Sequence, residues 1–282
     1  MSNKSFPDLD AYNEFTNDKQ IKVLSWNLWW KFENYLDRQK LIFNELKVLS
    51  PDILCLQEVW EDSENSQAKK IADLFEYEYT YSKSFEIDGV SFGNTIISKF
   101  PILKSSSHLI PTPSEFNENR TLIHSEVSYA DSKIDILCTH LNYRYDQSDI
   151  RQNQVEFILE YISKLENSKF PCILCGDFNA DPLSDEIMLI TGLKSPIKRT
   201  VLRDAWQITN RNDVGYTWSN INSYAKKTLE VDRRIDYIFV GKPARNGAGH
   251  PLKSTLVGTS PKDNMYPSCL LYTSPSPRDS DS

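Results

Sequence analysis

The sequence predicts a mixed α/β or α+β domain, and three features lead to this class. Segments with the period of a β-strand alternate in some places with amphipathic helices and in other places follow one another directly. Two strand-like segments, 52–59 and 171–178, are so apolar that both of their faces must be covered by other layers. No internal repeat and no linker divides the chain, so one layered domain is expected.

The first elements are a strand, a helix and a strand. Segment 21–30 is an apolar run that predicts a buried strand. Segment 37–52 repeats apolar residues at helical spacing until Pro51, which predicts an amphipathic helix ending there. Segment 52–59 then predicts a second buried strand.

A polar helix and a series of strands should follow. The helix is expected at 67–76, with Ile71, Leu74 and Phe75 turned towards the core. Strands are expected at 77–87, 91–100, 102–110, 121–129 and 133–141. Several of these are joined by short connections, as in hairpins.

The remaining part begins with the clearest helical pattern in the chain. Segment 148–167 opens with Ser148 and Asp149 as candidate caps, and it repeats Val155, Ile158 and Leu159 at helical spacing. After this helix we expect a strand at 171–182, a short helix at 184–191, a loop-rich stretch, and strands at 215–220 and 233–241.

Composition and charge are those of a soluble globular protein. The formal net charge of -7 argues against a broad basic face that would neutralise many phosphates in nonspecific nucleic-acid binding. The first ten residues do not resemble a signal peptide, and no apolar run is long enough to span a bilayer. A cytoplasmic monomer without stable membrane insertion is therefore expected, with a nuclear location left open.

Four of the five cysteines lie inside apolar strand-like runs, which suits reduced, buried thiols. Cys172 and Cys175 have C-x-x-C spacing, but residues three apart on a strand point to opposite faces. Zinc chelation and thioredoxin-like chemistry are therefore not expected at this pair.

Five strand-like segments end in polar residues that a plain core would not contain. These residues are Asn27, Glu58, His140, Asp177 with Asn179, and Asp236. Any one of them taken alone is more simply a strand end that reaches solvent. If all five ends meet at one rim of a sheet, they assemble the side chains that bind a hard divalent cation and a phosphate ester.

Within this set, Glu58 is the best candidate ligand for Mg²⁺, which needs one or two carboxylates together with water and substrate phosphate. Asp177 and Asn179 are two residues apart, so both point to the same side of an extended backbone. The carboxylate suits a base or a water-positioning group, and the carboxamide suits a donor to a phosphate oxygen. Gly176 permits close backbone approach just before them.

The same motifs resemble those of the endonuclease/exonuclease/phosphatase superfamily. "WNLWW", "PDILCLQEVW", "GNTIISKFPI", "THL", "GDFNADP" and "RRIDYIFV" occur in the order of that superfamily, over about residues 21–268. "GDFN" followed by "RIDYIF", after an upstream "LQE", is the most specific part. The resemblance implies a four-layer αββα sandwich of two packed mixed β-sheets flanked by helices, with the site at one rim.

The resemblance also implies roles for the strand-end residues. Asn27 and Glu58 match the metal-site residues, His140 the histidine that contacts the scissile phosphate, and Asp177 and Asn179 the catalytic strand. Asp236 matches the aspartate that orients a second histidine. The implied reaction is Mg²⁺-dependent, or Mn²⁺-dependent, hydrolysis of a phosphoester by in-line attack of water. Nucleic acid, a phospholipid head group or a small phosphodiester all remain candidate substrates, monoesters are not excluded, and the identity of the general base is open.

Four arginines and three tryptophans have two interpretations each. The arginines could contact phosphates near the rim or form surface salt bridges, and the tryptophans could stack on a base or pack a loop. They are Arg203, Arg211, Arg233, Arg234, Trp29, Trp30 and Trp60.

The sequence departs from the superfamily after Ser268. The superfamily has a Ser-Asp-His motif on a final strand, whereas this chain has Cys269 and Leu270 in place of the Asp and His. Beyond Ser268 the residues turn to Ser, Pro and Asp, with no alternation typical of a strand. We expect an N-terminal extension at 1–18, the family domain at 19–268, and a foreign or disordered tail at 269–282.

Two functional hypotheses follow. The first is a metal-dependent phosphoester hydrolase whose activity is far lower in this chain than in a form with the final histidine. The second is a noncatalytic module of the same fold that binds phosphate or a partner.

Overall fold

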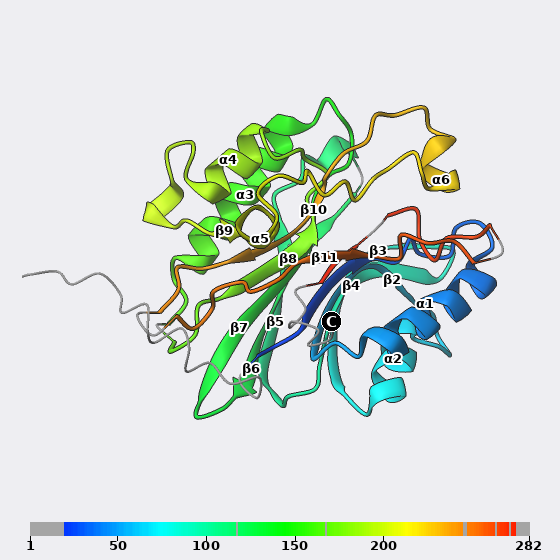
Figure 1. The fold of residues 1–282 in the computed structure, drawn as a ribbon, viewed down its shortest axis with the longest axis horizontal. Helices are drawn as coiled ribbons and strands as arrows, with labels where there is room; N and C mark the ends of the chain where they lie inside the picture. Colours follow the sequence, from blue (N-terminus) through cyan, green and yellow to red (C-terminus); the bar gives the residue numbers. More distant parts are fainter. Residues whose placement is uncertain are drawn as a thin grey trace, which may run out of the picture.

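Two six-stranded β-sheets pack face to face, and helices cover their outer surfaces (Figure 1). The computed structural model describes residues 20–116, 118–166, 168–244, 247–262 and 264–270, and the backbone of Tyr272–Ser274. The expected N-terminal extension, 1–18, and the last residues of the expected tail, 275–282, lie outside the described residues. The predicted αββα sandwich is confirmed.

The first sheet has the strand order β11-β12-β1-β2-β4-β3. Its strands are β1 (Val23–Asn27), β2 (Ile53–Glu61), β3 (Glu78–Ile87), β4 (Val90–Ser98), β11 (Thr255–Val257) and β12 (Tyr272–Ser274). The helices α1 (Tyr35–Leu49) and α2 (Gln67–Phe75) cover its outer face. Ile42 and Leu46 of α1, and Ile71 of α2, are buried with Leu24 and Leu54 of the strands.

The second sheet has the order β5-β6-β7-β8-β10-β9. Its strands are β5 (Ile102–Ile110), β6 (Arg120–Tyr129), β7 (Ser132–His140), β8 (Ile173–Asp177), β9 (Arg203–Asp204) and β10 (Asp236–Val240). The helices on this side are α3 (Ser148–Ile162), α4 (Asp185–Thr191) and α5 (Ala205–Thr209), and α6 (Ser223–Lys226) projects in the long connection before β10. Val155, Ile158 and Leu159 of α3 are buried against the sheet, as their spacing predicts.

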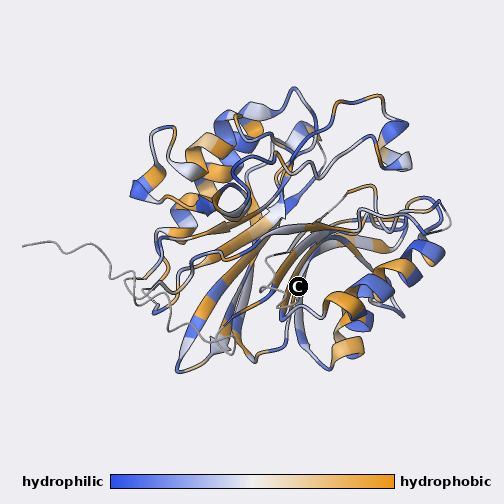
Figure 2. Cartoon of the chain, viewed as in Figure 1, coloured by the Kyte–Doolittle hydropathy of each residue, from blue (hydrophilic) through white to orange (hydrophobic). Residues whose placement is uncertain are grey.

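A third apolar layer lies between the sheets. Cys55 and Ile96 of the first sheet pack with Ile136, Cys138 and Cys175 of the second. Figure 2 shows apolar residues along the strands and on the sides of the helices that face them. Three stacked apolar layers explain why the two most apolar strands, β2 and β8, are covered on both faces.

The cysteine prediction is confirmed. All five cysteines, each within the described residues, are free thiols, and four of them are buried. Cys175 points between the sheets, whereas the half-buried Cys172 packs in the layer under α3, so the two lie on opposite faces of the strand.

The strand register brings the predicted site residues to one rim. β1 and β2 are parallel and end together, with Asn27 beside Gln57. β7 and β8 are also parallel, and His140 pairs with Asp177. β10 runs antiparallel to β8 and begins at that same end, where Asp236 pairs with Asp177.

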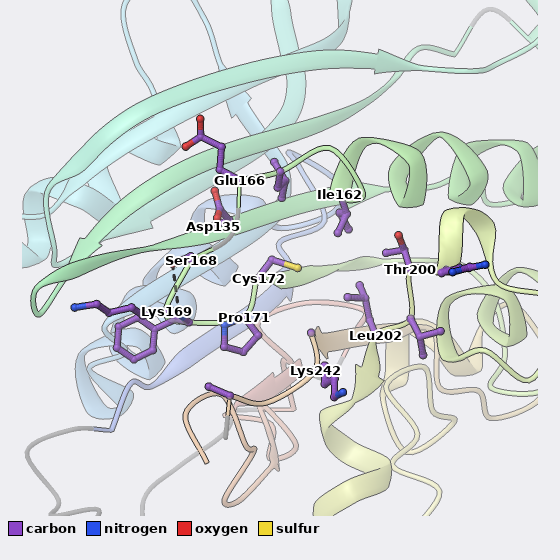
Figure 3. A pocket seen from close by; sticks show the side chains of 16 residues that line it. Asp135, Ile162, Glu166, Ser168, Lys169, Pro171, Cys172, Thr200, Leu202 and Lys242 are labelled. Carbon is purple, nitrogen blue, oxygen red and sulfur yellow. Dashed lines mark hydrogen bonds between the residues drawn. The ribbon is translucent and has the colours of Figure 1, made fainter. Parts of the chain in front are cut away.

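A cavity of about 340 Å³ lies at the opposite end of the second sheet (Figure 3). It is lined by Asp135 near the start of β7, by Cys172 before β8, and by Gly241 after β10. The rim with the predicted site residues and this cavity are therefore separated by the length of the strands.

Four details of the secondary structure differ from the sequence prediction. No strand forms at 215–220, where only an isolated bridge joins Trp218 to Arg233. The backbone N–H groups of Ile235 and Asp236, which a neighbouring strand would use, donate instead to the Thr217 hydroxyl. The cap of α3 is Gln147 rather than Ser148 or Asp149. The short β9 and α5 occupy the expected loop-rich stretch, and β12 forms in a segment whose sequence has no strand pattern.

None of the helices in the described ranges combines the length and the apolar character that crossing a membrane requires.

Candidate active site

An amide group joins two carboxylates at the centre of the rim. Asn27, the last residue of β1, donates from Nδ2 to Glu58 Oε1 at 2.9 Å and to Asp177 Oδ2 at 3.0 Å. Its own Oδ1 accepts from the backbone N–H of Trp29 at 2.9 Å, which fixes the orientation of the amide. The structure thus brings together three residues that lie far apart in the sequence.

Backbone geometry aims these side chains into the rim. Glu58 has a φ of 53° and lies at an irregularity of β2, between Leu56 and Val59, where pairing with β4 shifts register. Asn179 also has a positive φ, 50°. Non-glycine residues in this region cost about 1–3 kcal/mol each and persist where the surrounding structure holds them, often at functional sites.

The buried carboxylates repel one another. Burial raises the pKa of Glu58 to about 7, and Asp177 adds to this shift while the hydrogen bond from Asn27 opposes it. Burial also raises the pKa of Asp177, against the hydrogen bonds from Asn27 and from the Asn179 backbone and the charges of Arg120 and Arg233. The rim is therefore a site of concentrated, incompletely compensated negative charge.

His140 is held in one tautomer by an arginine. Arg120 Nη1 lies 3.1 Å from His140 Nδ1, and a guanidinium can only donate, so Nδ1 must accept. Burial, reinforced by the charge of Arg120, lowers the pKa of His140 well below its usual value. The imidazole is therefore neutral with its proton on Nε2, which faces Asp177 Oδ2 at 3.7 Å. Asn179 Nδ2 donates to the Leu141 carbonyl at 3.1 Å and also lies 3.1 Å from Nε2. Two donors cannot bond to each other, so with the proton on Nε2 the Asn179 amide must turn away from the ring before Nε2–H can donate to a substrate oxygen.

Asp236 is buried at this rim with neither carboxylate oxygen hydrogen-bonded among the described residues. Burial raises its pKa well above the usual value, and Asp177 and Glu58 raise it further. The Thr217 hydroxyl accepts from the Asp236 backbone N–H at 3.2 Å. A buried carboxyl group without a hydrogen bond is costly.

The segment after Pro267 packs beside these residues. Ser268 Oγ donates to the Asn27 carbonyl at 2.7 Å, and Asn222 Nδ2 donates to the carbonyls of Ser268 and Cys269. Leu270 is buried in an apolar cluster with Cys269 and with Ile235, the residue before Asp236. The position at which the sequence analysis expects the superfamily's histidine thus holds an apolar side chain packed beside Ile235.

Two arginines near the site were missed by the sequence analysis. Arg120 contacts His140, and Arg38 is fully buried on α1 with hydrogen bonds to carbonyls of the loop after Asn27. Arg120 is a charged residue at one end of an apolar strand, which is the feature that identified the other candidate site residues, so the sequence could have indicated it. Arg38 lies four and eight residues before Ile42 and Leu46, on the buried face of α1, so the helical spacing did carry a signal.

Six of the seven residues with two interpretations make structural contacts in this fold, whereas Arg211 is exposed. Arg233 pairs with Asp181, and Arg234 pairs with Asp204. Trp60 is buried, with the Lys31 ammonium 4.0 Å from its ring centre. Three more of these residues also make structural contacts. Arg203 donates to the Gly249 carbonyl, Trp30 donates to the Ser91 carbonyl, and Trp29 stacks near Tyr224.

The donor set fits a hard divalent cation that also binds water and substrate. Within the described residues, no three or more His, Cys, Asp and Glu side chains form a group able to hold a metal ion by themselves. Mg²⁺ does not need such a cage, since one or two carboxylates suffice. Burial, with a smaller contribution from Asp177, raises the pKa of Glu58, and a cation beside this carboxyl group would favour its charged form.

Comparisons with known proteins agree with this geometry. The model of the Endonuclease/Exonuclease/phosphatase family matches residues 24–256. Tyrosyl-DNA phosphodiesterase 2 of Homo sapiens is 25% identical over 276 residues, which are 95% of this chain and 70% of that protein. Inositol phosphosphingolipids phospholipase C of Schizosaccharomyces pombe is 25% identical over 229 residues, which are 75% of this chain and 52% of that protein.

Solved structures show the same fold. The structure of D. rerio TDP2 complexed with a single-strand DNA product has a TM-score of 0.72 at 23% identity, covering 90% of this chain and 98% of that chain. Together with the relatives, the family match supports a phosphoester hydrolase or nuclease-type function. Because that match spans most of the described domain, the chain belongs to the endonuclease/exonuclease/phosphatase family.

Proposed function

We propose that this chain is a divalent-cation-dependent phosphodiester hydrolase whose activity is limited by the residue at position 270. One observation carries the proposal: the Asn27 amide links the carboxylates of Glu58 and Asp177 next to the Nε2–H of a neutral His140. Two carboxylates that could hold a cation therefore lie beside a neutral imidazole that could donate to a phosphoryl oxygen. That combination suits phosphoryl transfer, in which positioning and charge stabilisation do most of the work.

Glu58 would hold Mg²⁺ or Mn²⁺, with Asn27 and Asp177 beside it. The bound cation would supply Lewis-acid stabilisation of charge on the phosphoryl group. His140 would donate from Nε2 to a phosphoryl oxygen, since Arg120 keeps the opposite nitrogen as an acceptor. Asn179 would donate to a second oxygen, and Asp177 would accept from the attacking water.

A row of aromatic rings beside His140 favours a substrate with an aromatic group near the phosphate. The Phe92 ring centre lies 6.1 Å from that of His140, and the half-buried Phe85 stacks on the buried Phe92 at 4.6 Å. In the loop after β7, Tyr143 and Tyr145 are 48% and 57% exposed, so Phe85 and these two tyrosines are the rings that a base could reach. Unpaired nucleobases stack on such rings, so a single-stranded nucleic acid is the favoured substrate, and a phospholipid head group is the alternative that a substrate panel would reveal.

The noncatalytic alternative rests on a specific observation. Leu270 packs at the position of the missing histidine, and Asp236 has no partner among the described residues. A module that binds phosphate without cleaving it would keep the carboxylates, the imidazole and the cation while lacking the last group.

The test is hydrolysis of bis(4-nitrophenyl) phosphate and of a labelled oligonucleotide, with Mg²⁺ or with a chelator. The wild-type chain should show weak, cation-dependent turnover, and Glu58→Gln and Asp177→Asn should abolish it. Glu156→Gln, an exposed carboxylate on α3, is the matched control. Phosphate binding without any turnover, in the wild type and in a form with a histidine at position 270, would support the noncatalytic alternative and contradict the hydrolase.

A further inference from the structure

Arg38 is a buried cation without an anionic partner. Its side chain is fully buried, and among the described residues it forms no ion pair within 4 Å. Burial lowers its pKa, which shows that the surroundings do not compensate for its desolvation. An unpaired buried charge is costly, so its hydrogen bonds should have a structural purpose.

Those hydrogen bonds converge on one loop. Arg38 donates to the carbonyls of Leu28 at 3.0 Å, Trp29 at 2.9 Å, Trp30 at 3.1 Å and Phe32 at 2.8 Å. The guanidinium carbon also lies 4.8 Å from the centre of the Trp29 ring. One side chain thus satisfies most of the carbonyls in the loop that directly follows Asn27.

The loop adopts a conformation that would not persist without such support. Trp29 and Trp30 have φ values of 59° and 37°, in the left-handed region that bulky residues avoid. This turn directs the Trp29 backbone N–H to Asn27 Oδ1 while the Trp29 carbonyl faces Arg38. The arginine and the amide are therefore connected through a single residue.

A second connection reaches the same amide from the C-terminal side. Arg38 Nη1 donates to the Pro267 carbonyl at 3.1 Å, and the next residue, Ser268, donates to the Asn27 carbonyl. Arg38 therefore holds both segments that flank Asn27, the loop that follows it in sequence and the segment that packs beside it.

We propose that Arg38 is a positioning residue that sets the orientation of the Asn27 amide, and through it the geometry of the Glu58 and Asp177 carboxylates that bind the cation. The inference rests on the proposed function for the cation itself. One part of the inference does not depend on catalysis: Arg38 holds the loop so that the Trp29 N–H donates to Asn27 Oδ1.

The test compares Arg38→Lys and Arg38→Gln with Arg151→Lys. Arg151 is the control because it is also buried and also donates to loop carbonyls, those of Asn142 and Arg144. It differs from Arg38 in pairing with Glu186, and within the described part of the chain it makes no hydrogen bond to the loop after Asn27. Mn²⁺ affinity, measured by water-proton relaxation without substrate, should fall about 10- to 100-fold in both Arg38 variants, as it does for other residues that orient metal ligands. In the Arg151→Lys control it should stay within about twofold of the wild-type value.

Two further measurements separate positioning from general destabilisation. When Asn27→Ala is already present, adding Arg38→Lys should weaken Mn²⁺ binding by less than about twofold, because the amide through which Arg38 acts is gone. Hydrogen exchange should show lower protection of the Trp29 amide in Arg38→Lys and Arg38→Gln than in Arg151→Lys.

Unchanged Trp29 protection and unchanged Mn²⁺ affinity in folded Arg38→Lys would overturn the inference. Additive losses in the Asn27→Ala background would also overturn it, since Arg38 would then act elsewhere. If wild-type protein binds no Mn²⁺, the proposed function fails, and the exchange of the Trp29 amide alone decides whether Arg38 positions the loop.

Discussion

Placing a histidine at position 270 should increase hydrolysis. Leu270 is 3% exposed and packs in a cluster with Ile235, the residue before Asp236. Asp236 has both carboxylate oxygens free of hydrogen bonds among the described residues, so an imidazole would meet an orienting group with its full capacity available. A positioned acid–base group contributes about 10²- to 10⁴-fold, which corresponds to about 2.7–5.5 kcal/mol of barrier.

The same change should have a small net effect on folding. Removing a buried Leu side chain costs about 1.5–3 kcal/mol of apolar burial. A hydrogen bond between the new imidazole and a charged Asp236 returns about 1.5–3 kcal/mol, so the free energy of unfolding should change by less than about 2 kcal/mol. In an Asp236→Asn background that compensation is lost, and Leu270→His should then destabilise the fold.

The assay is the Mg²⁺-dependent hydrolysis of bis(4-nitrophenyl) phosphate by wild type, Leu270→His and Leu270→Gln, each with and without Asp236→Asn. The glutamine variant controls for polarity without a titrating group. The rate gained by Leu270→His should depend on Asp236 and should show a limb near the usual imidazole pKa of about 6.5. A folded Leu270→His protein that is no faster than wild type, or equally fast without Asp236, would refute the reasoning.

Three further changes have defined outcomes. Asp236→Asn alone should stabilise the fold by about 1–3 kcal/mol at pH 7 in urea titrations. Burial raises the pKa of Asp236 in the folded state, so the gain in the free energy of unfolding should grow as the pH rises. The gain should vanish below about pH 4, where the carboxyl group is protonated in both the folded and the unfolded protein. Gly176→Ala should destabilise by about 1–3 kcal/mol on thermal denaturation, because the new methyl would lie 2.3 Å from the Thr139 carbonyl oxygen. Arg120→Met should raise the pKa of His140 in NMR titrations and slow turnover at least about tenfold, because the charge that keeps the imidazole neutral is removed.

The strand ends could be predicted from the sequence because two short-range rules suffice. Apolar runs mark buried strands, and parallel strands joined by helices end at the same edge of a sheet. The pairs Asn27 with Gln57 and His140 with Asp177 follow from those rules. The six predicted residues therefore meet, although nothing in the sequence gives the distances between them.

The roles of Arg38 and Arg120 could not be found in this way because they depend on contacts distant in sequence. Arg38 lies near the start of a helix, where an arginine usually faces solvent, and its burial results from the loop and the segment at Pro267 that close over it. Arg120 is seen as a site residue only once β6 and β7 are paired and His140 lies beside it. The strand expected at 215–220 was wrong for the same reason, because the hydrogen bonds of Thr217 with β10 decide its conformation.

The charges at the rim bear on whether the proposed cation site depends on the residue at position 270. Glu58 and Asp177 are held by Asn27, a neutral group that orients carboxylates but cannot neutralise them. The nearest buried guanidinium, Arg120, is committed to His140, and it only partly offsets the carboxylates. A divalent cation with its waters is a group that fits these oxygen donors, and in the proposed function it would supply the missing compensation. Asp236 makes none of the hydrogen bonds that join Asn27 to Glu58 and Asp177. In the proposed function the cation and the attacking water depend on that hydrogen-bonded group, and an imidazole at position 270 would act beside Asp236. A leucine at position 270 therefore need not abolish cation binding.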